Sequence, residues 1–426
     1  AGLVNQLTGG TGDARAVITL PSGGAALQST DANTTIDGST QTANVGDTNT
    51  GTLGSTETTG TDATPIAPLA QPEVEIAGHN SMSILLQLTG ANGVVRRVAA
   101  RGSSNTVYIT GTGYLIEGNA IGTSAIAYQW EGNVTVSGNF GIEILGSAVG
   151  TVQNNLIGYT GNSGIDIDNG LATAGVTTIQ GNQFNQNGYT SAGGDGVSLG
   201  DSGGSGPMLI QNNLFTRSNS SAVQFEIQQT AVSTVTNNTM VSCGKGGAGS
   251  ALSSLEGSAI CYLQRNGTRV GTQADVISKN LIVDTQASAI VVGYGQSNVT
   301  ITQNSIFNSG SIAIDLVFNP NAYVGGPGLG ATEYGSGDGV DLNNGAVATP
   351  PTPLPNRGMD YSVLTSLDVL AGNMIVSGFS RPGATVELYV PATDPTRFGE
   401  GRTFLYSRVE GSVDDTDAGT GAYGPA

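Results

Sequence analysis

The sequence has little charge, and almost none of that charge comes from lysine. Of its 426 residues 11% are charged, lysine occurs only at Lys245 and Lys279, and the formal net charge is −18. Such a chain repels nucleic acid, and no basic cluster compensates, so we expect no nucleic-acid partner. No apolar stretch approaches the roughly 18 residues of a transmembrane helix, so we expect no membrane span.

Cysteine is also scarce. Cys243 and Cys261 flank a Gly- and Ser-rich excursion. A disulfide between them would staple an inserted loop and stabilise the fold by about 3 kcal/mol. Two buried free thiols are the alternative. We expect the disulfide, because the rest of the composition is typical of proteins that are secreted or exposed at the cell surface.

What the chain does contain is glycine, at 66 positions, together with many Val, Ile and Thr residues. Its polarity comes from Asn, Thr, Ser and Gln rather than from charge. This combination predicts an all-β protein with tight turns and argues against a disordered acidic chain.

An internal repeat predicts how these strands are organised. Each unit holds an asparagine followed two residues later by a large apolar residue, at a central spacing that suits a solenoid coil of about 25 residues. The aligned residues are Asn119, Asn139, Asn155, Asn182, Asn213, Asn238, Asn280 and Asn304. Segment 133–140, which holds Asn139, fits more loosely than the others.

A second short strand follows most of these asparagines. It begins with a small residue and then alternates apolar, polar and apolar, which predicts one buried face. The segments are 124–128, 140–144, 163–167, 195–199, 221–225, 258–262, 288–292 and 312–316. Stacked coils would align the asparagines into a hydrogen-bonded ladder, and asparagine also tolerates the left-handed backbone that a corner needs.

This pattern resembles the pectate-lyase-like family of right-handed parallel β-helix repeats over about residues 75–318. The segments 16–28, 34–40 and 74–80 resemble the opening coils of large secreted bacterial β-helix proteins. The Thr- and Gly-rich insert 44–70 interrupts them, and we expect a surface arm with little core of its own.

The C-terminal region returns to strands after a Pro- and Gly-rich stretch. Strands are expected at 362–370, 373–380, 384–392 and 401–411, and the second and third resemble a bacterial immunoglobulin-like module. A sandwich of that kind needs about seven strands. We therefore expect a partial β-sandwich, either because the chain is a piece of a longer protein or because a neighbouring subunit donates a strand, with the N-terminal segment as donor. The expected organisation is an N-terminal arm and opening coils (1–80), a β-helix (81–318), a linker (319–360) and an incomplete immunoglobulin-like domain (361–426).

Candidate catalytic residues are few. Asp166 and Asp168 alternate with isoleucines and should share an outward face, with Asp195 one coil away. Such a trio could serve a hydrolase, although solvated polar residues are the more common outcome at outward positions. Asp338, Asp341 and Asn343 lie in a Gly-rich loop that could hold Ca²⁺ or form a plain turn. We expect no other cofactor.

These observations favour a structural or adhesive surface protein over an enzyme. We expect a rigid extracellular rod that self-associates, by strand donation or otherwise, into a fibre, and that meets a glycan or another cell-surface ligand. The alternatives are a carbohydrate-active β-helix enzyme using Asp166, Asp168 and Asp195, and a glycan-binding module using exposed aromatics such as Tyr128 and Trp130.

Overall fold

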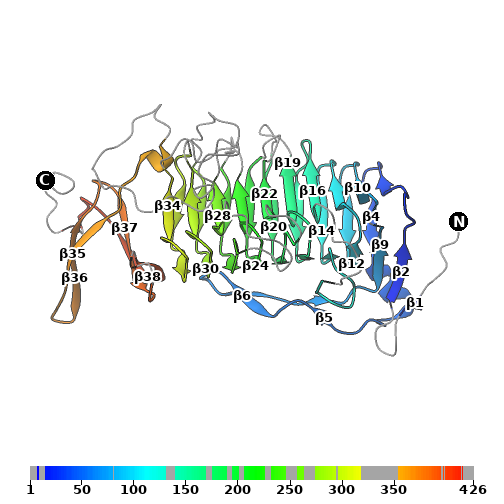
Figure 1. Cartoon of the computed structure of the whole chain (residues 1–426), viewed down its shortest axis with the longest axis horizontal. Coiled ribbons are helices and arrows are strands. Elements are labelled where there is room, and N and C mark those ends of the chain that lie inside the picture. Colours follow the sequence, from blue (N-terminus) through cyan, green and yellow to red (C-terminus); the bar gives the residue numbers. More distant parts are fainter. Residues whose placement is uncertain are drawn as a thin grey trace.

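The structure is a computed structural model, and three long sheets wound into a solenoid dominate it (Figure 1). It describes residues 7–8, 15–79, 81–130, 140–168, 175–189, 194–200, 206–225, 232–245, 257–262, 274–293, 296–317, 354–394, 397, 399–413 and 415. Within the described residues, no helix is long and apolar enough to cross a membrane.

Each coil contributes one strand to each sheet in turn, and neighbouring coils pair in parallel. The eleven-stranded sheet contains β1 (Leu7–Thr8), which pairs antiparallel with β2, then β2 (Arg15–Thr19), β9 (Val74–Ala77), β12 (Val98–Arg101), β15 (Ala120–Ile121), β18 (Leu156–Gly158), β21 (Gln183–Asn185), β24 (Leu214–Thr216), β27 (Thr239–Val241), β30 (Leu281–Val283) and β33 (Ser305–Phe307).

The ten-stranded sheet follows next along each coil. It contains β3 (Leu27–Ser29), β10 (Ile84–Leu88), β13 (Asn105–Ile109), β16 (Ile142–Leu145), β19 (Ile165–Asp168), β22 (Val197–Leu199), β25 (Val223–Phe225), β28 (Ile260–Tyr262), β31 (Ile290–Val292) and β34 (Ile314–Leu316).

The nine-stranded sheet completes the coils. It contains β4 (Thr35–Asp37), β11 (Val94–Arg96), β14 (Tyr114–Glu117), β17 (Gly150–Gln153), β20 (Thr177–Gln180), β23 (Met208–Gln211), β26 (Thr234–Thr236), β29 (Val276–Ser278) and β32 (Thr300–Thr302). The parallel β-helix predicted from the repeat is therefore confirmed.

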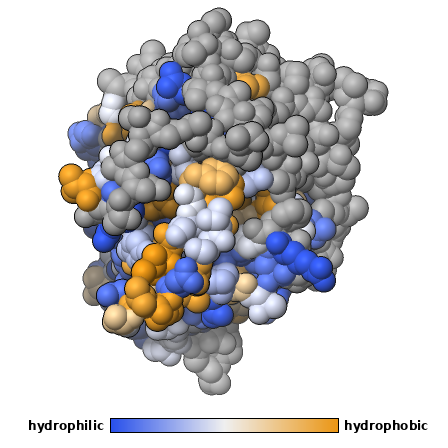
Figure 2. Space-filling view, turned by 90° about the vertical axis from the view of Figure 1, so that its left-hand side faces the viewer, coloured by the Kyte–Doolittle hydropathy of each residue, from blue (hydrophilic) through white to orange (hydrophobic). Residues whose placement is uncertain are grey.

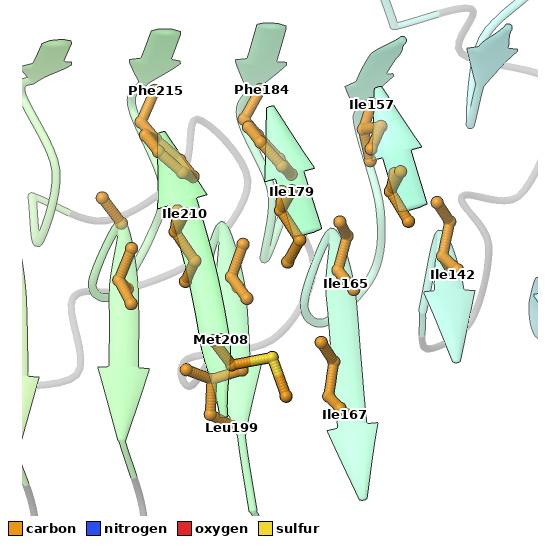
Figure 3. Close-up of a cluster of buried hydrophobic side chains, with 14 of the residues drawn as sticks. Ile142, Ile157, Ile165, Ile167, Ile179, Phe184, Leu199, Met208, Ile210 and Phe215 are labelled. Carbon is orange, nitrogen blue, oxygen red and sulfur yellow. The ribbon is translucent and has the colours of Figure 1, made fainter. Parts of the chain in front are cut away.

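The core is a set of apolar columns inside the solenoid (Figure 3). Because alternate residues of a strand face inward, in-register pairing stacks each inward side chain on its counterpart in the next coil. Phe184 and Phe215 stack in this way, with ring centroids 4.4 Å apart. Burying one such side chain contributes about 1.5–3 kcal/mol. One column in the eleven-stranded sheet runs through Ile76, Ala100, Ile121, Ile157, Phe184, Phe215, Met240, Ile282 and Ile306.

The aligned asparagines form a continuous ladder at the corner between the nine-stranded and the eleven-stranded sheets. In each step the side-chain amide donates to the Oδ1 of the next asparagine; from Asn155 to Asn182 the distance is 2.9 Å. The same amide also donates to a backbone carbonyl, that of Ile116 for Asn155. The ladder runs through Asn119, Asn155, Asn182, Asn213, Asn238, Asn280 and Asn304.

The left-handed backbone of this corner belongs to the residue before each ladder asparagine. Asn154 has φ of 56° and Asn237 has φ of 53°. Our expectation that the ladder asparagines themselves supply this conformation was wrong. The ladder asparagines instead form hydrogen bonds with buried polar groups. Each such group left unpaired would cost about 1–3 kcal/mol.

One predicted coil does not exist. Residues 124–128 form no strand, and β14 pairs directly with β17, so β15, β16 and β17 make one coil, with an insertion between β15 and β16. The ladder passes directly from Asn119 to Asn155. Asn139 lies outside the described residues. The sequence of 124–128 has the right small and apolar alternation, but the in-register partner of β13 is β16.

The insert between β4 and β9 runs along the outside of the solenoid (Figure 1). It holds α1 (Ser39–Val45), β5 (Thr52–Leu53), β6 (Glu57–Thr59), β7 (Thr64–Ile66) and β8 (Leu69–Ala70), with β5 paired to β8 and β6 to β7. We call residues 46–73 the strap. Leu53 and Leu69 pack on Ala99, Ala120 and Leu156 of the eleven-stranded sheet. The strap is therefore docked, rather than a free arm.

Polar contacts fasten the strap to successive coils. Gln183 accepts from the backbone N–H of Ser55 at 2.8 Å and donates to the carbonyl of Ser55 at 2.9 Å. Further along, the N–H of Gly60 donates to Oγ1 of Thr239 at 2.9 Å. The strap thus crosses the outer face of several coils.

Glu75 joins the first coils. Its buried carboxylate meets Nε of Arg15 and Nη2 of Arg101, each at 2.6 Å, and accepts the N–H of Ala125. These bonds lower the pKa of Glu75 although burial opposes them. One carboxylate therefore connects strands of three coils, because Arg15, Glu75 and Arg101 lie on β2, β9 and β12.

The C-terminal strands form two separate hairpins. β35 (Val363–Leu370) pairs with β36 (Asn373–Phe379), and β37 (Thr385–Pro391) pairs with β38 (Gly401–Val409). A short 3-10 helix, Pro355–Arg357, precedes them. The four expected strands are present as antiparallel pairs.

The second hairpin covers the end of the solenoid. The guanidinium of Arg402 lies 4.8 Å from the ring centroid of Phe307 in the last coil, and Glu400 accepts the backbone N–H groups of Asn308 and Ser309 at 2.7 Å. Polar groups of the second hairpin thus pair with the end of β33, the last strand of the eleven-stranded sheet.

The predicted disulfide is absent, and both cysteines are buried thiols. Cys243 belongs to the core inside the solenoid. Cys261 lies in the middle of β28 between inward Ile260 and Tyr262, so its side chain faces the other side of the sheet, where it packs with Val291. One thiol therefore lies inside the solenoid and the other on the outer face of the ten-stranded sheet.

Candidate functional site

The outward face of the ten-stranded sheet carries a row of polar side chains in register. Parallel pairing aligns Tyr108 with Glu143, Glu143 with Asp166, and Asp166 with Ser198. Neighbouring strands lie about 4.8 Å apart, so the carboxylates of Glu143 and Asp166 are neighbours. The register continues through Gln224, Cys261, Val291 and Asp315, where Cys261 and Val291 form an apolar contact.

Two of the three predicted aspartates join this row or its edge. Asp166 is 5% exposed, and Asp168 follows it on the same face of β19, opposite Leu145. Glu143 was not among the predicted residues, although its segment, FGIEI, aligns with SGIDI and places Glu143 at the position of Asp166. That alignment was the signal that could have found it.

Glu143 lies in a partly buried environment that shifts its pKa. Partial burial raises its pKa, a hydrogen bond from Nδ2 of Asn105 opposes that rise, and the negative charge of Asp168 adds to it. A carboxyl group whose pKa is raised beside other carboxylates is the arrangement that general acid catalysis uses.

Asp195 has a different role. It lies at the corner before β22, is 1% exposed, and its Oδ1 accepts the backbone N–H of Ser221 at 2.9 Å. Its own N–H lies 3.3 Å from Oγ of Ser163. Because Asp195 joins corners of successive coils, it is a structural residue and stands apart from the outer row of Asp166.

In the described part of the chain, no group of three or more His, Cys, Asp or Glu side chains is arranged to hold a metal ion. Asp338, Asp341 and Asn343, the Ca²⁺ candidates, lie outside the described residues.

Comparison with known proteins supports the fold. Residues 170–326 match the family model described as "Right handed beta helix region". No curated protein matches the chain. A solved structure described as "Crystal structure of Agl-KA catalytic domain" is similar at 13% identity and a TM-score of 0.25, over 57% of this chain and 58% of that chain. The chain therefore spans a little over half the length of that structure, and a likeness at this level carries no argument about function.

Proposed function

We propose that this right-handed parallel β-helix is an extracellular structural and adhesive protein, a rigid rod that associates with further copies of itself through its C-terminal hairpins. The observation that carries the proposal is where exposed apolar side chains gather. Most large apolar side chains that are exposed in the described residues belong to 359–413. They include Met359, Tyr361, Leu364, Leu367, Val369, Leu370, Met374, Ile375, Val390, Leu405 and Val409.

This surface lies at one end of the molecule. Figure 2, viewed from the side that carries the hairpins in Figure 1, shows apolar side chains running across that end. Val369 is 76% exposed and Leu367 is 65% exposed. Contiguous exposed apolar surface on a soluble protein marks a site of association.

A groove between the hairpins deepens this surface. It has a volume of about 320 Å³, and Leu364, Leu367, Met374, Leu388 and Leu405 are among its lining residues. Each hairpin is a two-stranded sheet in the described structure, so its outer edges offer unpaired backbone groups to a further strand. Strand addition at such an edge is one recurrent way in which subunits join.

The test compares two double variants by light scattering across a range of protein concentration. Leu367→Ser with Val369→Ser removes apolar surface from the hairpin. Val176→Ser with Val232→Ser removes two other exposed valines, 50% and 49% exposed, from the solenoid. We expect the first variant to stay monomeric where the wild type and the second variant assemble. Assembly of the hairpin variant like the wild type would refute the role of this surface.

A carbohydrate-active hydrolase is the second candidate, favoured by the raised pKa of Glu143 beside Asp168. In that function Glu143 would act as the acid and Asp166 or Asp168 as its carboxylate partner. A polysaccharide panel assayed with wild type and with Glu143→Gln tests it. Activity that disappears in the variant supports the enzyme, and a wild type that cleaves nothing removes it.

A further inference from the structure

Four aromatic side chains gather at the corner between the eleven-stranded and the ten-stranded sheets. Tyr128 and Trp130 come from the insertion after β15, Tyr159 follows β18, and Tyr189 lies in the turn after β21. The ring centroids are 5.9 Å apart for Tyr128 and Tyr159, 6.3 Å for Tyr159 and Tyr189, and 4.8 Å for Tyr189 and Trp130. The four rings therefore form one continuous cluster drawn from three coils.

The inner two rings are fixed by hydrogen bonds. The hydroxyl of Tyr128 lies 2.9 Å from the carbonyl oxygen of Gln183 and 3.1 Å from that of Ile157. The hydroxyl of Tyr159, whose side chain is largely buried, accepts from Nδ2 of Asn185 at 2.9 Å. These bonds hold the base of the cluster, so the outer rings sit on a rigid support.

The outer two rings meet solvent. Trp130 is 43% exposed and is the only tryptophan of the chain. Its ring is tilted by 33° against that of Tyr189, whose backbone N–H donates to the carbonyl of Thr160 at 2.9 Å. Packing alone does not account for this arrangement, because almost half of the largest apolar side chain remains in water.

Polar residues stand beside the aromatic residues in the chain or on the next coil. Gln129 beside Trp130 is exposed, and Gln186 is half-buried in the same turn as Tyr189. Arg217, exposed on the next coil, is close enough to Tyr159 to lower its pKa, although burial raises that pKa overall. An apolar floor with hydrogen-bonding groups at its edge is the general form of a site for small amphipathic ligands.

We propose that Trp130 and Tyr189 form a platform that binds a sugar ring of a neutral polysaccharide. One face of a pyranose ring presents C–H bonds, which pack flat on an aromatic ring, while its hydroxyl groups at the edge can reach the surrounding amides. The platform itself is uncharged, and a net charge of −18 disfavours an acidic polysaccharide. The inference rests on the proposed adhesive function and names the class of its ligand.

The single tryptophan makes the test direct. Cellohexaose, chitohexaose, maltohexaose, xylohexaose and mannohexaose are titrated into the protein while Trp130 emission is followed, with hexagalacturonate as the acidic comparison. We expect a saturable change with at least one neutral hexasaccharide, matched by heat of binding in calorimetry. If no neutral hexasaccharide binds, or if only hexagalacturonate binds, the proposal is overturned.

Variants then locate the site by calorimetry. Trp130→Ala and Tyr189→Ala should each weaken binding by about tenfold or more, the usual loss when one stacking contact is removed. Tyr361→Ala, which removes a tyrosine that is 55% exposed near the C-terminal hairpins, should bind like the wild type. Thermal melts establish that each variant is folded, and Trp130→Phe, which keeps an aromatic ring, should retain part of the affinity. Unchanged affinity in folded Trp130→Ala contradicts the proposal.

The two proposals fail separately. Glycan binding is measured on the hairpin variant Leu367→Ser with Val369→Ser as well as on the wild type, and we expect equal affinities. If the wild type does not assemble but a neutral sugar binds at Trp130, the proposed self-association is refuted and the sugar-binding platform is supported. If no sugar binds but assembly depends on the hairpins, only the platform is lost.

Discussion

Lys279 and Asp62 form an ion pair, with Nζ 3.0 Å from Oδ2, although 217 positions of sequence separate them. The pair lies near the far end of the strap, where the backbone N–H of Thr61 also donates to the carbonyl of Lys279 at 2.9 Å. A segment that leaves the solenoid after the first coil is thus fastened to a coil near the other end. The strap ties the stack lengthwise, in addition to the pairing between neighbouring coils.

Removing the buried anchor of the strap should loosen it. Gln183→Ala deletes the group that pairs with both backbone groups of Ser55 and with the carbonyl of Ala67. We expect a loss of about 1–3 kcal/mol and faster cleavage within residues 46–73 in limited proteolysis. Asp62→Asn is the control, because its ion pair is solvent-exposed and worth less than about 1 kcal/mol. Equal cleavage rates in Gln183→Ala and wild type would show that the strap is held elsewhere.

The asparagine ladder should contribute far more to the free energy of unfolding than the side-chain amides outside it. Asn182→Ala removes the acceptor for two donors of Asn155 and the donor to Val152 and Asn213. Because these groups are buried, we expect the free energy of unfolding to fall by about 3 kcal/mol.

The matched control for the ladder is Gln180→Ala, in the same coil. Gln180 also stacks amide on amide, with Gln153 and Gln211, but on the partly exposed outer face. Its loss should cost less than about 1 kcal/mol, measured by urea unfolding. Similar costs for the two variants would argue against a special role for the ladder.

Stability should also depend on a carboxyl group inside the solenoid. Burial raises the pKa of Asp275 to about 6, although the N–H of Ser233 donates to its Oδ1 at 2.6 Å. The folded state therefore holds this proton more tightly than the unfolded chain does. Asp275 therefore contributes most to the free energy of unfolding below its unfolded-state pKa, near 4. This contribution, about 3 kcal/mol, is lost as the pH rises through 6.

Asp275→Asn isolates this effect, since asparagine can still accept from Ser233 and carries no charge. We expect the variant to be more stable than the wild type at pH 8 and to approach it at pH 4.5, in urea unfolding at both values. A constant difference between the two proteins from pH 4.5 to pH 8 would mean that Asp275 does not titrate in this range.

The sequence predicts the solenoid well because the same types of side chain recur at the same positions of each coil. Inward residues such as Ile179 and Phe184 must be apolar in every coil, and the ladder asparagines must recur at one corner. Segment 124–128 misled the prediction because its alternation equals that of a true strand. Only the pairing of β13 with β16 distinguishes them, and pairing is a property of the assembled stack.

The roles of residues that do not belong to the coil repeat were harder to predict. Glu75 stands in a recognisable segment, yet its bonds to Arg15 and Arg101 depend on three coils being stacked. The strap residues have no repeat, so nothing local indicates that Ser55 meets Gln183 across 128 positions. The cysteines were mispredicted because their separation in sequence says nothing of which face of a sheet each thiol occupies.

Electron microscopy of the purified wild-type chain, beside the variant carrying Leu367→Ser and Val369→Ser, shows whether the C-terminal hairpins join one rod to the next. We expect regular filaments or end-joined rods for the wild type and single short rods for the variant at the same concentration. Single rods for both proteins at every concentration would contradict the proposal that this β-helix is a self-associating structural protein.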